Sequence, residues 1–175
     1  MDWYSTVFEL IDMRSFSNLW YWIGLAVIWS SASHWVLGVP YDLVHSAARY
    51  GEQRQQDLED LVRINTNRMV HIGEVSGLWI MGISCAILSG LAILGFAYWI
   101  EFAQALFLIL FPLAIVGVMS LQTARGIMRR RLEGEALQRR LRLHRLYVQI
   151  IGLVAIFVTA MWGMWQNMTT GALGG

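Results

Sequence analysis

The chain of 175 residues is 57% hydrophobic, has only 14% charged residues and has a mean hydropathy of +0.49. Soluble domains carry about 25% charged residues, so this composition excludes an ordinary soluble protein and predicts an integral membrane protein. The formal charge of +1 excludes nothing further, but the thirteen cations, all of them Arg, are unevenly placed. The single cysteine, Cys85, lies in an apolar run, which indicates a small buried hydrophobic residue.

The N-terminal region is acidic, with Asp2, Glu9 and Asp12 against one basic residue, Arg14. A signal peptide begins with a positively charged region, so we expect this region not to be one. Residues 3–14 place apolar side chains at helical spacing beside a narrow polar stripe, which predicts a short helix in the outer membrane interface. The alternative is a plain lead-in to the first membrane span.

The first predicted span covers residues 19–38, which contain no charged residue. At about 1.5 Å per residue, a helix of this length reaches about 30 Å, the thickness of the hydrocarbon core. Ala26, Ser30 and His34 recur every four residues and form a face of small and polar groups suited to close helix contact. Pro40 is expected to end or bend the segment.

Residues 41–76 are polar and mix Arg with acidic side chains at helical spacing, which predicts helical extensions outside the membrane. Two apolar segments follow, at 77–99 and 103–121. One continuous helix over both would be about twice as long as the bilayer core is thick. The chain must therefore turn near Glu101, although no Gly or Pro marks the turn.

Small residues recur every four positions in the second span, at Gly82, Ala86 and Gly90. Such a ridge lets a neighbouring backbone approach closely, which matters in lipid because larger apolar side chains gain little from contact with another helix. In the third span, Pro112 removes one backbone donor and predicts a kink.

Residues 123–146 form the most basic segment, and eight of the thirteen Arg lie there. We expect two helix ends joined by a turn around Gly134. The fourth span follows at 147–165, with small residues along one side at Gly152, Ala155 and Gly163. The uncharged, Gly-rich tail after it is predicted to be mobile.

Counted by compartment, one Arg precedes the first span, four lie in residues 41–76 and eight in residues 123–146. The positive-inside rule therefore places both long loops in the cytoplasm and both termini in the periplasm. The predicted fold is a single all-α membrane domain over residues 1–175. It has four transmembrane helices arranged as two hairpins, with cytoplasmic helical extensions and the N-terminal interfacial helix.

No motif for catalysis is present, neither a phosphate-binding loop nor a nucleophile elbow nor a zinc-protease helix. No Asp, Glu or Arg lies deep inside a span, so we expect neither an enzyme nor a proton-coupled pump. The spacing of the four His predicts no metal site. His34 is the one candidate axial ligand for haem or bacteriochlorophyll, and a structural hydrogen bond to a neighbouring helix is the favoured interpretation.

The Arg cluster is the most distinctive feature of the sequence. Its arginines can bind anionic lipid headgroups, at about 1 kcal/mol each near the surface, or an acidic partner protein. The alternative is that they only determine topology. Nucleic-acid binding is not expected, because the aromatic residues lie in the membrane belts and not among the arginines. The docking candidates are Arg129, Arg130, Arg131, Arg139, Arg140, Arg142 and Arg145.

Three stretches carry a resemblance to a known group: MDWYSTVFELIDMRSFSNLWYWIGLAVIWSSASHWVLGVPYDLV, DLEDLVRINTNRM and IFVTAMWGMWQN. Together they resemble small four-span inner-membrane proteins of purple alphaproteobacteria and their marine relatives. Members of that group are often labelled as a component of the Suf iron–sulfur assembly complex. The resemblance implies a bacterial inner membrane, in organisms rich in respiratory and photosynthetic complexes. The chain contains no CxxC pair or nucleotide motif.

Three functions fit the sequence. The leading hypothesis is a non-catalytic accessory or assembly subunit, which packs its small-residue faces against a larger membrane complex and docks through its Arg-rich helices. The second is a haem- or pigment-binding membrane protein that uses His34. The third is a small homo-oligomeric channel or transporter lined by the serines of the first two spans, Ser30, Ser33, Ser84 and Ser89.

Overall fold

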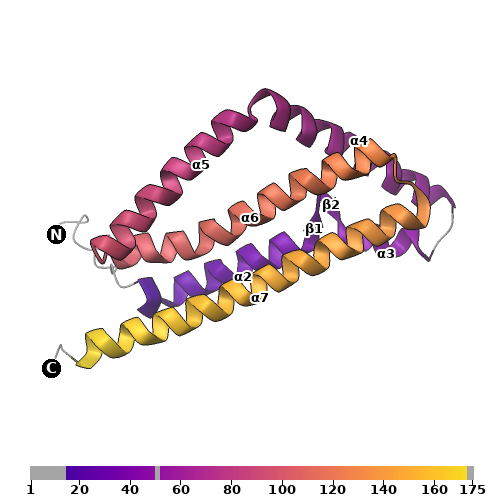
Figure 1. Ribbon diagram of the computed structural model, residues 1–175. Coiled ribbons are helices and arrows are strands. Elements are labelled where there is room, and N and C mark those ends of the chain that lie inside the picture. The colour runs from indigo at the N-terminus through magenta and orange to yellow at the C-terminus, as the bar shows by residue number, and fades with distance from the viewer. Residues whose placement is uncertain (1–14, 50–51, 173–175) are drawn as a thin grey trace, which may run out of the picture.

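The computed structural model describes residues 15–49 and 52–172 (Figure 1). Apart from one hairpin of two-residue strands, its regular structure is helical, which confirms the predicted all-α class. The interfacial helix predicted at residues 3–14 lies outside the described residues. In chain order the elements are η1 (Ser15–Ser17), α2 (Leu19–His34), β1 (Trp35–Val36), β2 (Val39–Pro40), α3 (Tyr41–Ala47), α4 (Glu52–Val75), α5 (Gly77–Ala92) with its π-helical end η2 (Ile93–Ala97), α6 (Glu101–Arg130) and α7 (Gly134–Ala172).

Among the described residues, three helices are long and apolar enough to cross a membrane: Gly77–Ala97, Glu101–Arg130 and Gly134–Met168. The predicted spans 77–99, 103–121 and 147–165 coincide with or lie within these helices. The chain is thus suited in length and composition to a membrane. The tail predicted to be mobile continues α7 to Ala172, because nothing between Tyr147 and Gly171 breaks the helix.

The first predicted span ends earlier than expected, because α2 stops at His34 after 16 residues. The chain then forms an antiparallel hairpin in which Trp35 pairs with Pro40 and Val36 with Val39. Leu37 and Gly38 make the two-residue turn, and both have positive φ values, 53° and 75°. Glycine adopts this conformation without steric cost, and the Gly38 carbonyl accepts a hydrogen bond from the Asn65 side chain at 3.0 Å.

Two further reversals lie where the sequence predicts them. Trp99, with φ of 56°, turns the chain just before Glu101 opens α6. At the other end of α6, Arg131 adopts the left-handed conformation and Gly134, also with positive φ, begins α7. The backbone N–H of Gly134 donates to the Glu59 carboxylate at 2.8 Å. A carboxylate in this position satisfies an orphan donor and complements the positive end of the α7 dipole.

We expect Glu59→Ala to lower stability by about 1 kcal/mol, because it removes this cap together with the 2.6 Å hydrogen bond from the Gln55 amide. Thermal unfolding of the detergent-solubilised protein would measure the loss. Asp57→Ala, at an exposed position two residues earlier in α4, is the control and should leave the unfolding midpoint unchanged. Equal unfolding midpoints for the Glu59 and Asp57 variants would show that Glu59 does not stabilise the protein by capping α7.

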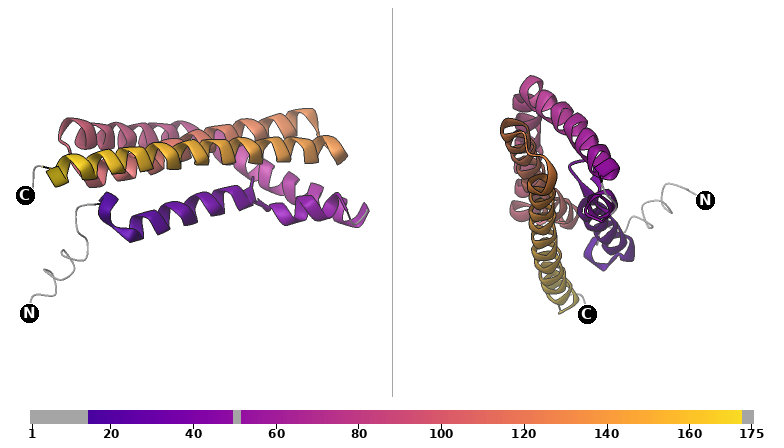
Figure 2. Two further views of the ribbon diagram at one scale, coloured as in Figure 1. Left: turned by 90° about the horizontal axis from the view of Figure 1, so that it is seen from below. Right: turned by 90° about the vertical axis from the view of Figure 1, so that its right-hand side faces the viewer.

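Helices α2, α6 and α7 pack around one apolar cluster. Leu25 and Trp29 of α2, Ile109 of α6 and Ala155 of α7 form a buried apolar cluster between them. Figure 2 shows α2 running beside α7, with α6 above the pair. These contacts give the molecule a compact three-helix core in its apolar half.

Helix α5 stands apart from this core. None of its residues is buried, and Figure 1 shows it diverging from α6 in a triangle whose apex is the junction with α4. Cys85, predicted to be buried, is consequently exposed. The predicted pairing of the first two spans as a hairpin is not confirmed, since α2 packs against α7 and α5 meets α6.

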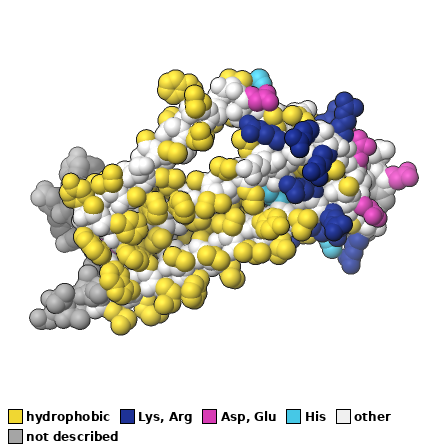
Figure 3. All heavy atoms as spheres, in the orientation of Figure 1, with side chains coloured by type: hydrophobic (Ala, Val, Ile, Leu, Met, Phe, Trp, Pro, Cys, Tyr) yellow, Lys and Arg dark blue, Asp and Glu magenta, His cyan; other side chains and the backbone are white. Residues whose placement is uncertain are grey.

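The polar half forms a second packed unit, which we call the head: residues 35–49 and 52–75 with the adjoining ends of α6 and α7. Its core joins the hairpin to α4 and α7 through residues such as Val39, Leu58 and Leu141, each fully buried. Figure 3 shows the Arg and acidic side chains gathered at this end and hydrophobic side chains over the rest of that face. The predicted extensions are therefore one packed structure with its own core.

Candidate functional site: an open helix face and an arginine-rich end

The small-residue ridge of α5 is open. Gly82 and Ala86 are exposed, Gly90 is half-buried, and a Cβ atom added at Gly82 or Gly90 would meet nothing within 4 Å. The small-residue positions Ala26 and Ser30 on α2 are likewise exposed. No described part of the chain covers these predicted packing residues.

The small residues of α7 behave in the opposite way. A Cβ atom at Gly152 would lie 2.7 Å from the ring of Trp29, and one at Gly163 would lie 3.2 Å from the ring of Phe16. Ala155 is buried in the same interface. The predicted packing residues thus fall into two groups. Those on α7 contact α2 and the residues before it, and those on α5 and α2 are open among the described residues.

Gln104 fastens the end of α5 to the core, and the sequence analysis missed it. This fully buried side chain donates from Nε2 to the carbonyl of Gly95 at 2.8 Å and accepts at Oε1 from the indole N–H of Trp162 at 2.9 Å. It therefore joins α5, α6 and α7 at one point. An uncharged polar residue near the start of an apolar helix is the signal that could have indicated it.

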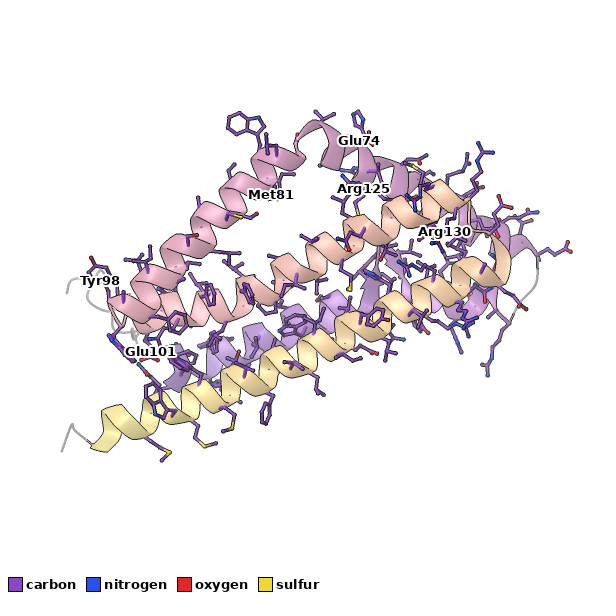
Figure 4. The ribbon with its side chains drawn as sticks, in the orientation of Figure 1. Glu74, Met81, Tyr98, Glu101, Arg125 and Arg130 are labelled. Carbon is purple, nitrogen blue, oxygen red and sulfur yellow. The ribbon has the colours of Figure 1, made fainter. Side chains whose placement is uncertain are left out.

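The same end of the molecule holds Glu101, the first residue of α6. It is half-buried, and its Oε1 accepts a 2.7 Å hydrogen bond from the backbone N–H of Phe16. Figure 4 shows Glu101 and Tyr98 where α5 meets α6, with Arg130 at the opposite end of α6. Hydrogen bonds of Glu101 and Gln104 therefore fix the α5–α6 turn. Helix α5 is held at its two ends, by this turn and by the head.

A hollow of about 350 Å³ lies between the diverging helices. Leu88 of α5 contributes one wall, and Phe111, Ile115 and Val118 of α6 contribute the other. Gln122 lies at the head end of the same wall. Figure 3 shows an opening through the molecule at this place, so the described residues leave part of α5 and α6 without protein contact.

The predicted docking arginines are not equivalent. Six are exposed: Arg129, Arg130, Arg131, Arg139, Arg140 and Arg142. Arg145 is half-buried, donates from Nε to the carbonyl of Ser33 at 3.2 Å and stacks over the ring of Tyr41 with 3.7 Å between guanidinium carbon and ring centroid. Arg145 therefore holds α7 to the C-terminal end of α2, which leaves the other six as the outward-facing set.

His144 lies buried where α6 and α7 enter the head. Its Nε2 is 3.3 Å from the Ser120 hydroxyl and its Nδ1 is 3.2 Å from the Thr123 hydroxyl. Because Ser120 donates its own proton to the Val116 carbonyl, its oxygen must accept from Nε2–H. Nδ1 then accepts from Thr123. The neutral imidazole is satisfied at both nitrogens and has a structural role.

The candidate cofactor ligand His34 lies in the last turn of α2, exposed, with its ring against the edge of Trp35. Within residues 15–49 and 52–172, no three His, Cys, Asp or Glu side chains are grouped so that they could hold a metal ion. The serines of the channel hypothesis divide between α2, which packs on α7, and α5, which stands apart. One copy of the chain does not bring those serines together.

Comparison with known proteins adds no relative from which a role could be transferred. No protein-family model, curated protein or solved structure matches the chain. The function is therefore inferred from the chain's own geometry.

Proposed function

We propose that this chain is a non-catalytic accessory or assembly subunit of a larger complex in a bacterial inner membrane. One observation carries the proposal: the small-residue ridge of α5 is open among the described residues, whereas Gly152 and Gly163 of α7 pack against Trp29 and Phe16. The resemblance noted in the sequence suggests respiratory, photosynthetic or iron–sulfur-related complexes as the setting.

The physical argument concerns how helices associate in lipid. Apolar side chains gain nothing by leaving lipid for another apolar surface, so association depends on close backbone packing and on interhelical hydrogen bonds. Gly82 and Gly90 supply the close approach and nothing in the described chain uses it. A transmembrane helix of a partner would fit on this ridge, and the exposed arginines of the head would meet an acidic surface of the same partner.

The proposed topology includes α2 as a fourth span. Its 16 residues measure about 24 Å, and η1 before it adds about 6 Å, so the two together match the hydrocarbon core. The Arg-rich head then lies in the cytoplasm and both termini in the periplasm, following the positive-inside rule. Reporter fusions at the C-terminus, active only in the periplasm, would test this orientation.

Replacing Gly82 with Leu is expected to abolish co-purification of the partner while leaving the subunit folded. The added side chain blocks the close approach of a second helix, and its Cβ atom meets no described atom of this chain within 4 Å. The measurement is affinity purification from native membranes in mild detergent, followed by mass spectrometry of wild type and variant. Ile87→Leu, an exposed and volume-conserving change on the same helix, is the matched control.

A wild-type protein recovered alone under these conditions would argue against a stable complex. Equal partner recovery with the Gly82 variant and with the control would contradict the role of the ridge specifically. An absorption spectrum of the purified wild-type protein tests whether His34 binds haem or a pigment. A colourless sample would exclude both cofactors.

A further inference from the structure

A second groove runs between α6 and α7, and its outer part is entirely apolar. This hollow has a volume of about 310 Å³ and is lined by residues such as Phe111 and Ile115 of α6 and Ile151, Val154 and Val158 of α7. Val154 and Val158 are half exposed, so the hollow opens sideways towards the bilayer. It offers apolar contact without any hydrogen-bonding group.

A smaller hollow of about 230 Å³ lies between the same two helices near the head. Its lining includes polar side chains among apolar surface: Met119, Gln122 and Thr123 come from α6, and Arg140, His144 and Tyr147 come from α7. No Asp or Glu lines it. Arg140 is exposed and makes no hydrogen bond or ion pair to any residue that the structure describes, so its charge is available to an anion.

The two hollows are parts of one groove. On α6 the lining positions continue from Ile115 through Met119 to Gln122, in steps of three and four that keep one face of a helix. On α7 they run from Val158 to Arg140, a separation of eighteen residues or about 27 Å. That length is more than half the thickness of the hydrocarbon core, so the groove is long enough for the acyl chains of one leaflet and for a headgroup at the end that carries Arg140.

We propose that this groove binds one anionic phospholipid, with its acyl chains along Ile115, Val154 and Val158 and its phosphate beside Arg140. The apolar end matches hydrocarbon chains, and the groove is long enough for the chains and headgroup of one lipid. Arg140, which has no ion-pair partner among the described residues, matches a negatively charged headgroup. The neutral ring of His144 hydrogen-bonds to the hydroxyl groups of Ser120 and Thr123. It forms the base of the headgroup end of the groove and adds no charge there. Gln122 and Tyr147 place further hydrogen-bonding groups around the phosphate position.

The proposal is independent of the partner complex, because it needs only this chain and a lipid. The test uses the purified, delipidated protein in mild detergent, to which phosphatidylglycerol or phosphatidylcholine is added, and native mass spectrometry counts bound lipids. We expect one tightly held phosphatidylglycerol per chain and weaker binding of phosphatidylcholine. Equal binding of the two lipids would overturn the proposed headgroup contact.

Arg140→Gln tests the charged end. One cation near the surface contributes about 1 kcal/mol, which corresponds to about a fivefold loss of phosphatidylglycerol affinity. Arg142→Gln is the matched control, since its side chain is exposed on a different side of α7 and lines neither hollow. Equal losses for both variants would show that binding follows the general charge of the head, which contradicts a defined site.

Val154→Trp tests the apolar end by filling the groove from an exposed position, and should reduce lipid occupancy about tenfold. The control is Leu153→Trp, where the neighbouring side chain is 72% exposed and lies outside the groove. Unchanged occupancy with the Val154 variant would place the lipid elsewhere. If that variant instead displaces a protein during purification from native membranes while lipid binding persists, the groove holds a partner helix and the proposal fails.

Discussion

Replacing Gly152 with Leu is expected to separate α2 from α7 and to lower the free energy of unfolding by about 3 kcal/mol. A Cβ atom alone would lie 2.7 Å from the Trp29 ring, closer than van der Waals contact allows. Trp29 is only 4% exposed and is packed on all sides, so its ring has no free space to enter. Overpacking of this kind costs about 1–3 kcal/mol, and a leucine in direct conflict with a rigid ring belongs at the upper end.

The loss can be measured by titrating the protein from mild detergent into denaturing detergent while following the fluorescence of its tryptophans. Gly82→Leu is the matched control: it is the same substitution in a predicted transmembrane ridge, at a position where the added side chain meets open space. The control should unfold at the wild-type midpoint. A Gly152 variant as stable as the control would mean that α2 does not pack on α7 as described.

Replacing Gln104 with Leu is expected to cost about 2 kcal/mol and to release the lower end of α5. The change removes both hydrogen bonds of the buried side chain, those to Gly95 and Trp162. Each unsatisfied buried group costs about 1–3 kcal/mol in general. Interhelical hydrogen bonds in membranes contribute less, about 0.6 kcal/mol each on average. The expected loss of stability for the two bonds of Gln104 lies between the values that these two figures give.

The same unfolding titration measures this variant. Gln149→Leu on α7 is the control because its side chain is exposed and makes no hydrogen bond within the described residues. We expect destabilisation by Gln104→Leu only. Equal stability of both variants would show that α5 is held by its other contacts with α6.

The three long apolar helices and the turns near Glu101 and Gly134 could be predicted, because the length of a span is limited by bilayer thickness. The turn near Glu101 follows from that limit alone, and the structure forms it at Trp99 without Gly or Pro. The end of α2 at His34 could not be predicted from bilayer thickness. There the apolar run continues to residue 39, but its last part pairs as a hairpin and is buried in the head, a tertiary effect that overrides hydropathy.

Small-residue spacing identified helix surfaces but not their partners. Gly82 and Gly152 lie in equivalent sequence patterns, yet only Gly152 contacts another helix of the chain. The difference arises because α4 carries α5 away from the core, a consequence of the head's packing that no local pattern records. Gln104 was missed for the same reason: its importance depends on Gly95 and Trp162, which are distant in sequence or belong to another helix.

The most direct test of the account is photo-cross-linking from the α5 ridge in native membranes. A photoreactive amino acid at Ala86 would face the proposed partner, and one at the exposed Leu153 of α7 serves as the control. The account predicts a discrete adduct with one membrane protein from position 86 and none from position 153. Adducts with lipid alone from position 86 would contradict the subunit proposal.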